Sequence, residues 1–179
     1  MRYDAIYSLI DVFKPKIIAE IGTWNGHNAV RMIQAAQKHH SDIAYIGYDL
    51  FEDATDETDA LEFNVKPHNT IDAVRATIEA TGARVILHKG NTRQTLKDHP
   101  PIADFMFLDG GHSVETIASD YHYSKHIPVI VFDDFYDGRE IDLNLVGCNK
   151  LVSSLSGCVV LPDADPVKGG GFTKLVLKI

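Results

Sequence analysis

The sequence has few of the features that mark secreted, membrane or zinc-binding proteins. It contains two cysteines, Cys148 and Cys158, with no C-x-x-C spacing, so it indicates neither a zinc site nor a disulfide framework. No apolar run approaches the roughly eighteen residues of a membrane-spanning helix, and the first residues lack a signal-peptide core. We therefore expect a soluble, cytoplasmic protein with two reduced thiols and no membrane partner.

Positive charge is also scarce. The chain has 17 Lys and Arg against 25 Asp and Glu, which gives a formal net charge of -8. Binding to a phosphate backbone needs clustered cations, so duplex nucleic acid is not an expected partner. With 179 residues, of which 45 % are hydrophobic, the chain has the size and composition of one globular domain spanning residues 1–179.

Short apolar runs alternate with helical segments, a pattern typical of βαβ units and a mostly parallel sheet. The expected strands are Ile17–Ile21, Ala44–Leu50, Arg84–His88, Ala103–Leu108, Val129–Phe132, Cys158–Leu161 and Thr173–Lys178. The expected helices are Asn28–His39, Thr70–Ala80, Val114–His126 and Glu140–Leu155. The connection between the last two strands is too short for a crossover helix, which predicts an antiparallel hairpin. The long segment Phe51–Asn69, which includes Phe63, is expected to be a functional lid or a mobile linker.

A glycine turn follows the first expected strand. Its motif, Glu20-x-Gly22-x-x-x-Gly26, lets the backbone turn sharply and approach a ligand closely. The spacing differs from the G-x-G-x-x-G pattern that binds the pyrophosphate of dinucleotides. The second expected strand ends at Asp49, and an acid there can reach ribose hydroxyls in the crevice at the carboxyl ends of the strands.

With these residues the chain resembles the class I S-adenosylmethionine-dependent methyltransferases, and the resemblance covers nearly its whole length. It implies an α/β fold, a Rossmann-like three-layer α/β/α sandwich whose seven-stranded sheet has the order 3-2-1-4-5-7-6 and an antiparallel C-terminal hairpin. It also implies S-adenosyl-L-methionine as cofactor. The implied cofactor-binding residues are Glu20, Gly22, Thr23, Trp24, Gly26, Asp49, Leu50, Asn91, Thr92 and Asp109. The alternative for Asn91 and Thr92 is that either one caps a short helix, Thr92–Leu96.

Acids also follow the fourth and fifth expected strands, at Asp109 and at Asp133 and Asp134. The ends of neighbouring strands lie about 4.8 Å apart, and three carboxylates in so small a space repel one another unless a proton or a cation neutralises them. Asp-Gly-x-His followed about twenty residues later by Asp-Asp is similar to macrocin-type sugar O-methyltransferases and, more distantly, to catechol O-methyltransferases. Since those families are metal-dependent, the resemblance implies a metal site at Asp109, Asp133 and Asp134. The alternative is that Asp109 or Asp134 caps the next helix.

The expected function is methylation of a hydroxyl on a small-molecule or sugar acceptor, assisted by Mg²⁺ or another divalent cation. Asp109 and His112 are the expected catalytic residues, with His112 as general base, and Lys125 or His126 are alternative bases. His122 and His126 have the i, i+4 spacing of a metal pair, but that spacing on a polar helix face is more typical of solvated side chains. Two alternatives stay open: a non-catalytic methyltransferase-fold subunit and a nicotinamide-dependent oxidoreductase. A homo-oligomer is left open as well.

Overall fold

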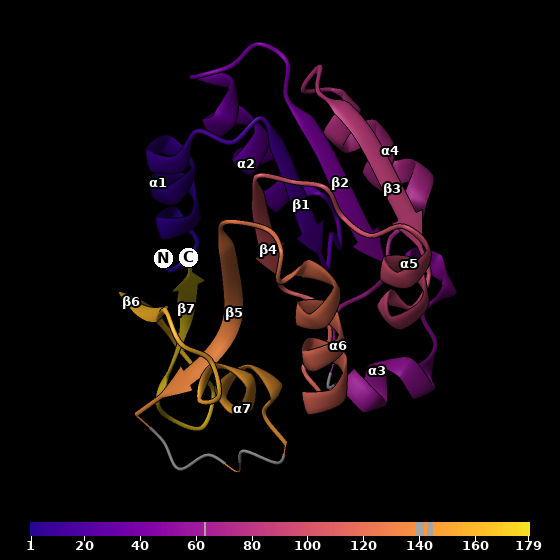
Figure 1. Ribbon diagram of the computed structural model, residues 1–179. Helices are drawn as coiled ribbons and strands as arrows, with labels where there is room; N and C mark the ends of the chain where they lie inside the picture. The colour runs from indigo at the N-terminus through magenta and orange to yellow at the C-terminus, as the bar shows by residue number, and fades with distance from the viewer. Residues whose placement is uncertain (63, 139–141, 143–144) are drawn as a thin grey trace.

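A seven-stranded sheet forms the centre of the protein (Figure 1). The computed structural model describes residues 1–179 except 63, 139–141 and 143–144. The strands are β1 (Ile17–Ile21), β2 (Ala44–Asp49), β3 (Arg84–Lys89), β4 (Phe105–Leu108), β5 (Ile130–Asp137), β6 (Cys158–Pro166) and β7 (Phe172–Lys178). Their order is β3-β2-β1-β4-β5-β7-β6; the first five strands in this order are parallel, and β7 is antiparallel to β5 and β6. The predicted order and the predicted C-terminal hairpin are both confirmed.

Helices cover both faces of the sheet and complete the three-layer fold (Figure 1). One face packs against α1 (Asp4–Phe13), α2 (His27–Gln37) and α4 (Ile71–Glu79). The other face packs against α5 (Thr92–Asp98), α6 (Val114–Ser124) and α7 (Gly147–Val152). Two short elements, η1 (Phe51–Asp53) and α3 (Asp56–Glu62), follow β2. Among the described residues, no helix combines the length and the apolar character needed to cross a membrane.

The structure differs from the sequence prediction mainly outside the central strands. Helix α1 was not predicted, although Ile6 and Ile10 have the i, i+4 spacing of a buried helix face and both are fully buried. The expected lid contains η1 and α3, and β5 and β6 continue past their expected ends. The last expected helix begins at Gly147 in the structure, while the expected start of that helix, Glu140, and the lid residue Phe63 lie outside the described residues.

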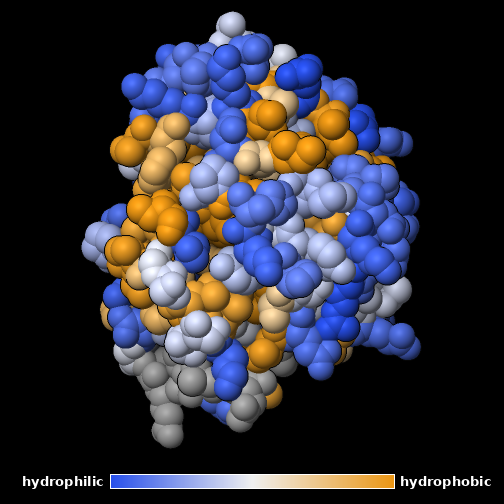
Figure 2. Space-filling view, in the orientation of Figure 1, coloured by the Kyte–Doolittle hydropathy of each residue, from blue (hydrophilic) through white to orange (hydrophobic). Residues whose placement is uncertain are grey.

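Hydrophobic residues gather on the surface over α1 and the β6–β7 edge of the sheet (Figure 2). Val12, Val159 and Ile179 are among the exposed large hydrophobic residues of these elements and of the chain end. Strand β6 pairs on one side with β7, so its other side is an outer edge of the sheet.

A buried acid on α6 gives a testable pH dependence of stability. Asp120 is 2 % exposed, its Oδ1 has no hydrogen-bond partner among the described residues, and burial raises its pKa to about 7. A raised carboxyl pKa means that the folded state holds the proton more tightly than the unfolded state does. Asp120 therefore destabilises the fold increasingly as the pH rises from the ordinary pKa of an aspartate to about 7. We expect the stability of Asp120→Asn, relative to the unmodified chain, to increase by roughly 2–3 kcal/mol between pH 5 and pH 8.

Urea unfolding at the two pH values measures this change. Asp163→Asn is the matched control because Asp163 is exposed, and its stability relative to the unmodified chain is expected to stay constant. Parallel pH curves for Asp120→Asn and the unmodified chain would show that Asp120 does not hold a proton in the folded state.

Candidate active site

The glycine turn after β1 requires glycine at position 22. Gly22 has φ +87°, and its N–H donates to the Tyr48 carbonyl at 2.9 Å. A Cβ at this position would lie 1.9 Å from the carbonyl oxygen of Asp109, at the end of the neighbouring strand β4. The turn after β1 therefore lies directly against Asp109, the first of the three acids that follow β4 and β5.

Asp49 braces the same turn from the end of β2. Its Oδ2 accepts from the Trp24 N–H at 2.7 Å, and its Oδ1 accepts from the Phe51 N–H at 2.9 Å. A carboxylate offers about four lone-pair sites, so these two bonds leave acceptor capacity for a ligand hydroxyl. The expected ribose-binding residue thus lies beside the glycine turn.

Glu20 lies beneath the turn, almost completely buried. It accepts hydrogen bonds from Asn28 Nδ2 at 2.9 Å and from the Tyr45 hydroxyl, and burial raises its pKa to about 7. Tyr7 in turn donates to Asn28 Oδ1 at 2.7 Å, so α1, α2 and β2 all help to fix the position of this acid. Such a satisfied network orients a carboxyl group at low dielectric.

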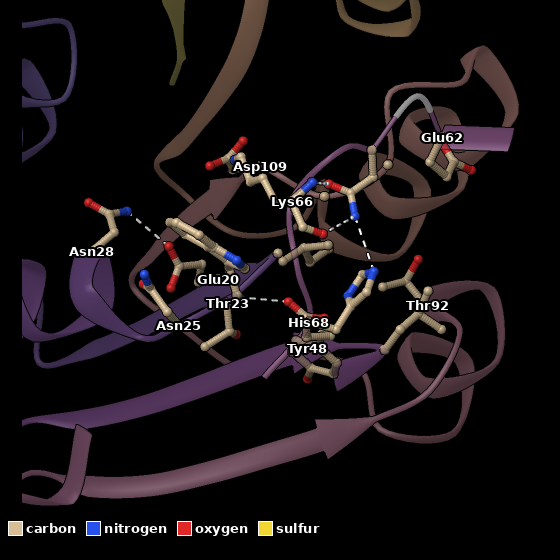
Figure 3. Close-up of a pocket in the computed structure, with 18 of the residues that line it drawn as sticks. Glu20, Thr23, Asn25, Asn28, Tyr48, Glu62, Lys66, His68, Thr92 and Asp109 are labelled. Carbon is tan, nitrogen blue, oxygen red and sulfur yellow. Dashed lines mark hydrogen bonds between the residues drawn. The ribbon is translucent and has the colours of Figure 1, made fainter. Parts of the chain in front are cut away.

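A cavity of about 360 Å³ lies above these residues at the carboxyl ends of the strands (Figure 3). Nine of the ten expected cofactor residues line it: Glu20, Gly22, Thr23, Trp24, Asp49, Leu50, Asn91, Thr92 and Asp109. Gly26 does not line it. A Cβ on Gly26 would meet Ile78 and Val74, so this glycine allows α2 to pack closely on α4. Asn91 also caps α5 by accepting from the Arg93 N–H, which confirms its capping role and leaves its expected cofactor contact a prediction.

The segment after β2 closes over this cavity and is held at several points. Glu62 of α3 accepts from the Ser113 N–H at 2.8 Å and from the Thr116 hydroxyl at the start of α6. Farther along, Trp24 Nε1 donates to the Pro67 carbonyl at 2.9 Å, and Lys66 Nζ lies 5.2 Å from the Trp24 ring centroid. The length of this segment predicts a functional lid or a mobile linker, and no motif in the sequence indicates these anchors.

The three acids after β4 and β5 do converge. One carboxylate oxygen from each of Asp109, Asp133 and Asp134 lies within 4.8 Å of the others. The capping alternative is wrong, because Ser113 caps α6 and Asp134 lies in an irregularity of β5, with φ +56°, where the pairing with β7 shifts. The irregularity lets the side chains of two successive residues, Asp133 and Asp134, lie at the same end of the sheet as Asp109.

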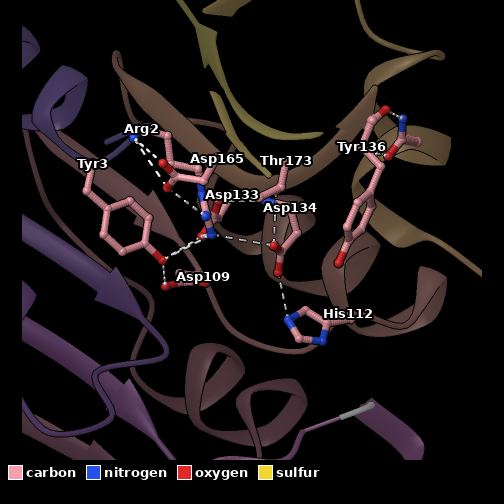
Figure 4. Close-up of polar contacts among 10 residues, drawn as sticks. Arg2, Tyr3, Asp109, His112, Asp133, Asp134, Tyr136, Asp165 and Thr173 are labelled. Carbon is pink, nitrogen blue, oxygen red and sulfur yellow. Dashed lines mark hydrogen bonds and ion pairs between the residues drawn. The ribbon is translucent and has the colours of Figure 1, made fainter. Parts of the chain in front are cut away.

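Side chains of the protein already engage these acids (Figure 4). Arg2 binds Asp133 through two parallel hydrogen bonds, and the Tyr3 hydroxyl lies 2.7 Å from Asp133 Oδ2 and 2.9 Å from Asp109 Oδ2. His112 Nε2 lies 2.8 Å from Asp134 Oδ2. Neither Arg2 nor Tyr3 was identified from the sequence.

The environment pulls the pKa values of these groups apart. Burial, together with the charges of Asp133 and Asp134, raises the pKa of Asp109 well above its ordinary value. Burial acts the same way on Asp134, but the hydrogen bond and charge of His112 outweigh it and lower the pKa of Asp134. Burial lowers the pKa of His112, but the hydrogen bond to Asp134 outweighs it and gives a net rise. An acid that favours its neutral form thus lies beside an ionised acid paired with a histidine.

A second cavity, of about 390 Å³, adjoins the first. The two share Asp109, Gly110, Gly111 and His112. Apolar groups of Ile117, Val146, Cys148 and Val167 line the second cavity, together with Tyr136, Asp133 and Asp134. Two ligands could therefore meet at the loop that follows β4.

The alternative bases lie elsewhere: His126 Nε2 bonds the Pro101 carbonyl before β4, at the opposite end of that strand, and Lys125 is its neighbour in sequence.

The sequence matches the model of a known protein family. A family model described as a methyltransferase domain matches residues 19–135. The chain belongs to the methyltransferase-domain family. The matched segment of this methyltransferase runs from β1 into β5, and so contains the glycine turn, Asp49 and the three clustered acids. Arg2 and Tyr3 precede it.

Solved structures share the fold of the methyltransferase at low sequence identity. The O-methyltransferase TomG from Streptomyces achromogenes, solved with S-adenosylmethionine, is 15 % identical with a TM-score of 0.67, covering 99 % of this chain and 79 % of TomG. An O-methyltransferase from Bacillus cereus, solved with S-adenosylhomocysteine, is 15 % identical with a TM-score of 0.61, covering 98 % and 79 %. No curated protein matches the sequence.

Proposed function

We propose that this methyltransferase transfers the methyl group of S-adenosylmethionine to a hydroxyl oxygen of a small-molecule or sugar acceptor. The observation that carries the proposal is the meeting of two cavities at Asp109 and His112, one of them lined by the glycine turn and Asp49. The donor and product bound in the relatives from Streptomyces achromogenes and Bacillus cereus support the assignment of the first cavity to the cofactor.

The first cavity would hold the donor in an orientation that aims its methyl group at the second. Asp49 would accept from the ribose hydroxyls, and Asn91 would face the adenine amino group. Gly22 and Thr23 would lie against the methionine half, because the turn that contains them touches Asp109. Holding the sulfonium and the acceptor at the shared loop supplies the proximity on which in-line methyl transfer depends.

His112 would act as general base on the acceptor. With Nε2 donating to Asp134, the neutral imidazole keeps its lone pair on Nδ1, and the acceptor hydroxyl would replace the contact that His112 makes with the Glu62 backbone carbonyl. The hydroxyl oxygen then forms a bond to the methyl carbon as the carbon–sulfur bond breaks, its electron pair staying on the sulfur of neutral S-adenosylhomocysteine. The proton remains on His112, where Asp134 stabilises the resulting imidazolium.

The predicted divalent cation fits this site poorly. The carboxylates lie close enough for a shared ion, but Arg2 and Tyr3 engage both oxygens of Asp133, and Tyr3 also engages one of Asp109. A metal would have to displace these groups, so we place no step of the reaction on one.

The predicted homo-oligomer and the predicted cytoplasmic location stay predictions. Light scattering measures the oligomeric state.

Calorimetric titration with S-adenosylhomocysteine tests the proposed cofactor. We expect saturable binding, and Asp49→Asn should weaken it by about 10- to 100-fold, since a hydrogen bond to a charged group contributes about 1.5–3 kcal/mol. Asp163→Asn, on the exposed surface, is the control and should bind as the unmodified chain does. No heat of binding at high micromolar ligand would reject the proposal.

Turnover separates an enzyme from a non-catalytic binding subunit. We expect S-adenosylhomocysteine to accumulate when the protein is mixed with S-adenosylmethionine and a panel of catechols and sugars. Cofactor binding with no turnover across the panel would favour the binding-subunit alternative.

A further inference from the structure

The guanidinium of Arg2 contacts two of the three clustered acids, Asp133 and Asp134 (Figure 4). Its Nε and Nη2 donate to Asp133 Oδ1 and Oδ2 at 2.7 and 2.8 Å, the paired geometry that matches a planar fork to a carboxylate. The same Nη2 lies 3.7 Å from Asp134 Oδ1, and Nη1 lies 3.2 Å from Asp165 Oδ2. One cation thus contacts three carboxylates.

Tyr3 joins the remaining acid to this group. Its hydroxyl lies within hydrogen-bond distance of Asp133 and Asp109, and its ring packs edge-on against Phe107 of β4 with centroids 5.8 Å apart. A phenol carries one proton, so it donates to one of these oxygens at a time and accepts from the other only when that oxygen is protonated. The hydroxyl therefore bridges the ends of β4 and β5.

Arg2 and Tyr3 are fixed parts of the fold. Their carbonyl oxygens accept from the N–H groups of Ala5 and Ile6 in the first turn of α1, and the Arg2 N–H donates to Asp165. Ile6 is fully buried in the core, and the Arg2 side chain is 15 % exposed. Because α1 is packed into the core, the position of both side chains is set by the fold.

We propose that Arg2, with Tyr3, replaces a divalent cation in this site. This inference rests on the proposed function. The guanidinium supplies the positive charge that keeps Asp133 and Asp134 together, and Asp134 in turn orients His112. Arg2 is a positioning residue, because it acts through the carboxylates, and methyl transfer then proceeds without a metal.

Manganese binding, followed by electron paramagnetic resonance, tests the replacement without requiring turnover. The unmodified chain, carrying any tag at its C-terminal end, should bind no Mn²⁺ at this cluster up to millimolar concentration. The Arg2→Met/Tyr3→Phe double variant frees the carboxylate oxygens. It should bind Mn²⁺ with a Kd at least tenfold below that millimolar limit. Arg31→Met is the matched control, because Arg31 pairs with Asp4 at the exposed surface; it should leave Mn²⁺ binding unchanged.

Two results would overturn the proposal. One is Mn²⁺ binding by the unmodified chain that Asp133→Asn removes, because Arg2 would then yield to a metal. The other is a folded double variant that binds no Mn²⁺, because the carboxylates would then form no cation site for Arg2 to fill. If the double variant does not fold, Mn²⁺ binding is measured on Arg2→Gln, which keeps Tyr3 and a polar side chain at position 2, and the same two results would overturn the proposal. S-adenosylhomocysteine calorimetry on the unmodified chain reports separately on the proposed function.

Discussion

Gly22→Ala should abolish detectable binding of S-adenosylhomocysteine and lower the free energy of unfolding by about 2–4 kcal/mol. The added Cβ would lie 1.9 Å from the Asp109 carbonyl oxygen and 2.5 Å from its carbonyl carbon. Both atoms belong to backbone at the end of a buried strand, which cannot turn away as a flexible side chain would. The ends of β1 and β4 would have to separate, which would displace the turn from the cavity.

Backbone strain at a positive φ contributes to this cost, and Gly82→Ala measures that contribution alone. Gly82 has φ +80°, close to the +87° of Gly22, but a Cβ there would meet nothing within 4 Å. We expect Gly82→Ala to cost about 1 kcal/mol in urea unfolding and to leave ligand binding unchanged in calorimetry. Equal effects of the two substitutions would mean that close approach to Asp109 plays no part.

The central strands and the place of the site were predictable because they depend on short-range patterns. Four consecutive buried residues form β4, and Asp109 follows them directly, as Asp49 ends β2. In a parallel sheet such residues lie at the same ends of the strands, so strand order alone brought Asp49, Asp109 and the glycine turn together.

The partners of the acids were not predictable in the same way. Arg2 and Tyr3 lie more than 100 residues from Asp133 and Asp109 in sequence, and no motif joins them. Their place depends on how α1 packs, which the two isoleucines of α1 indicate only weakly. Glu62 was missed because α3 is short and has no buried residue, so it lacks the periodic pattern of a packed helix.

These missed residues change the chemistry assigned to the site. Three converging carboxylates predict a metal when they are considered alone, whereas the same carboxylates with Arg2, Tyr3 and His112 are largely satisfied by the protein. In the proposed mechanism the Asp134–His112 pair supplies an orienting acid and a base, as in other sites where a carboxylate fixes the tautomer of a histidine. Under this proposal turnover should depend on general base catalysis by His112 and not on Lewis-acid activation by a metal.

His112→Asn should accordingly lower kcat by about 10²- to 10⁴-fold, the usual contribution of a positioned general base. Affinity for S-adenosylhomocysteine should change by less than about threefold, because the cofactor contacts would come from Glu20, Asp49 and the glycine turn. His122→Asn is the matched control: His122 is an exposed histidine on α6, and its loss should leave kcat unchanged.

The pH profile distinguishes a base from a residue that only shapes the cavity. A general base must be neutral to act, so kcat of the unmodified chain should rise with pH through the pKa of His112, which Asp134 raises above its ordinary value against the opposing effect of burial. The residual activity of His112→Asn should lack this rising limb, because asparagine does not titrate. A variant that loses activity but retains the limb would assign the titrating base to another residue and leave His112 with a packing role.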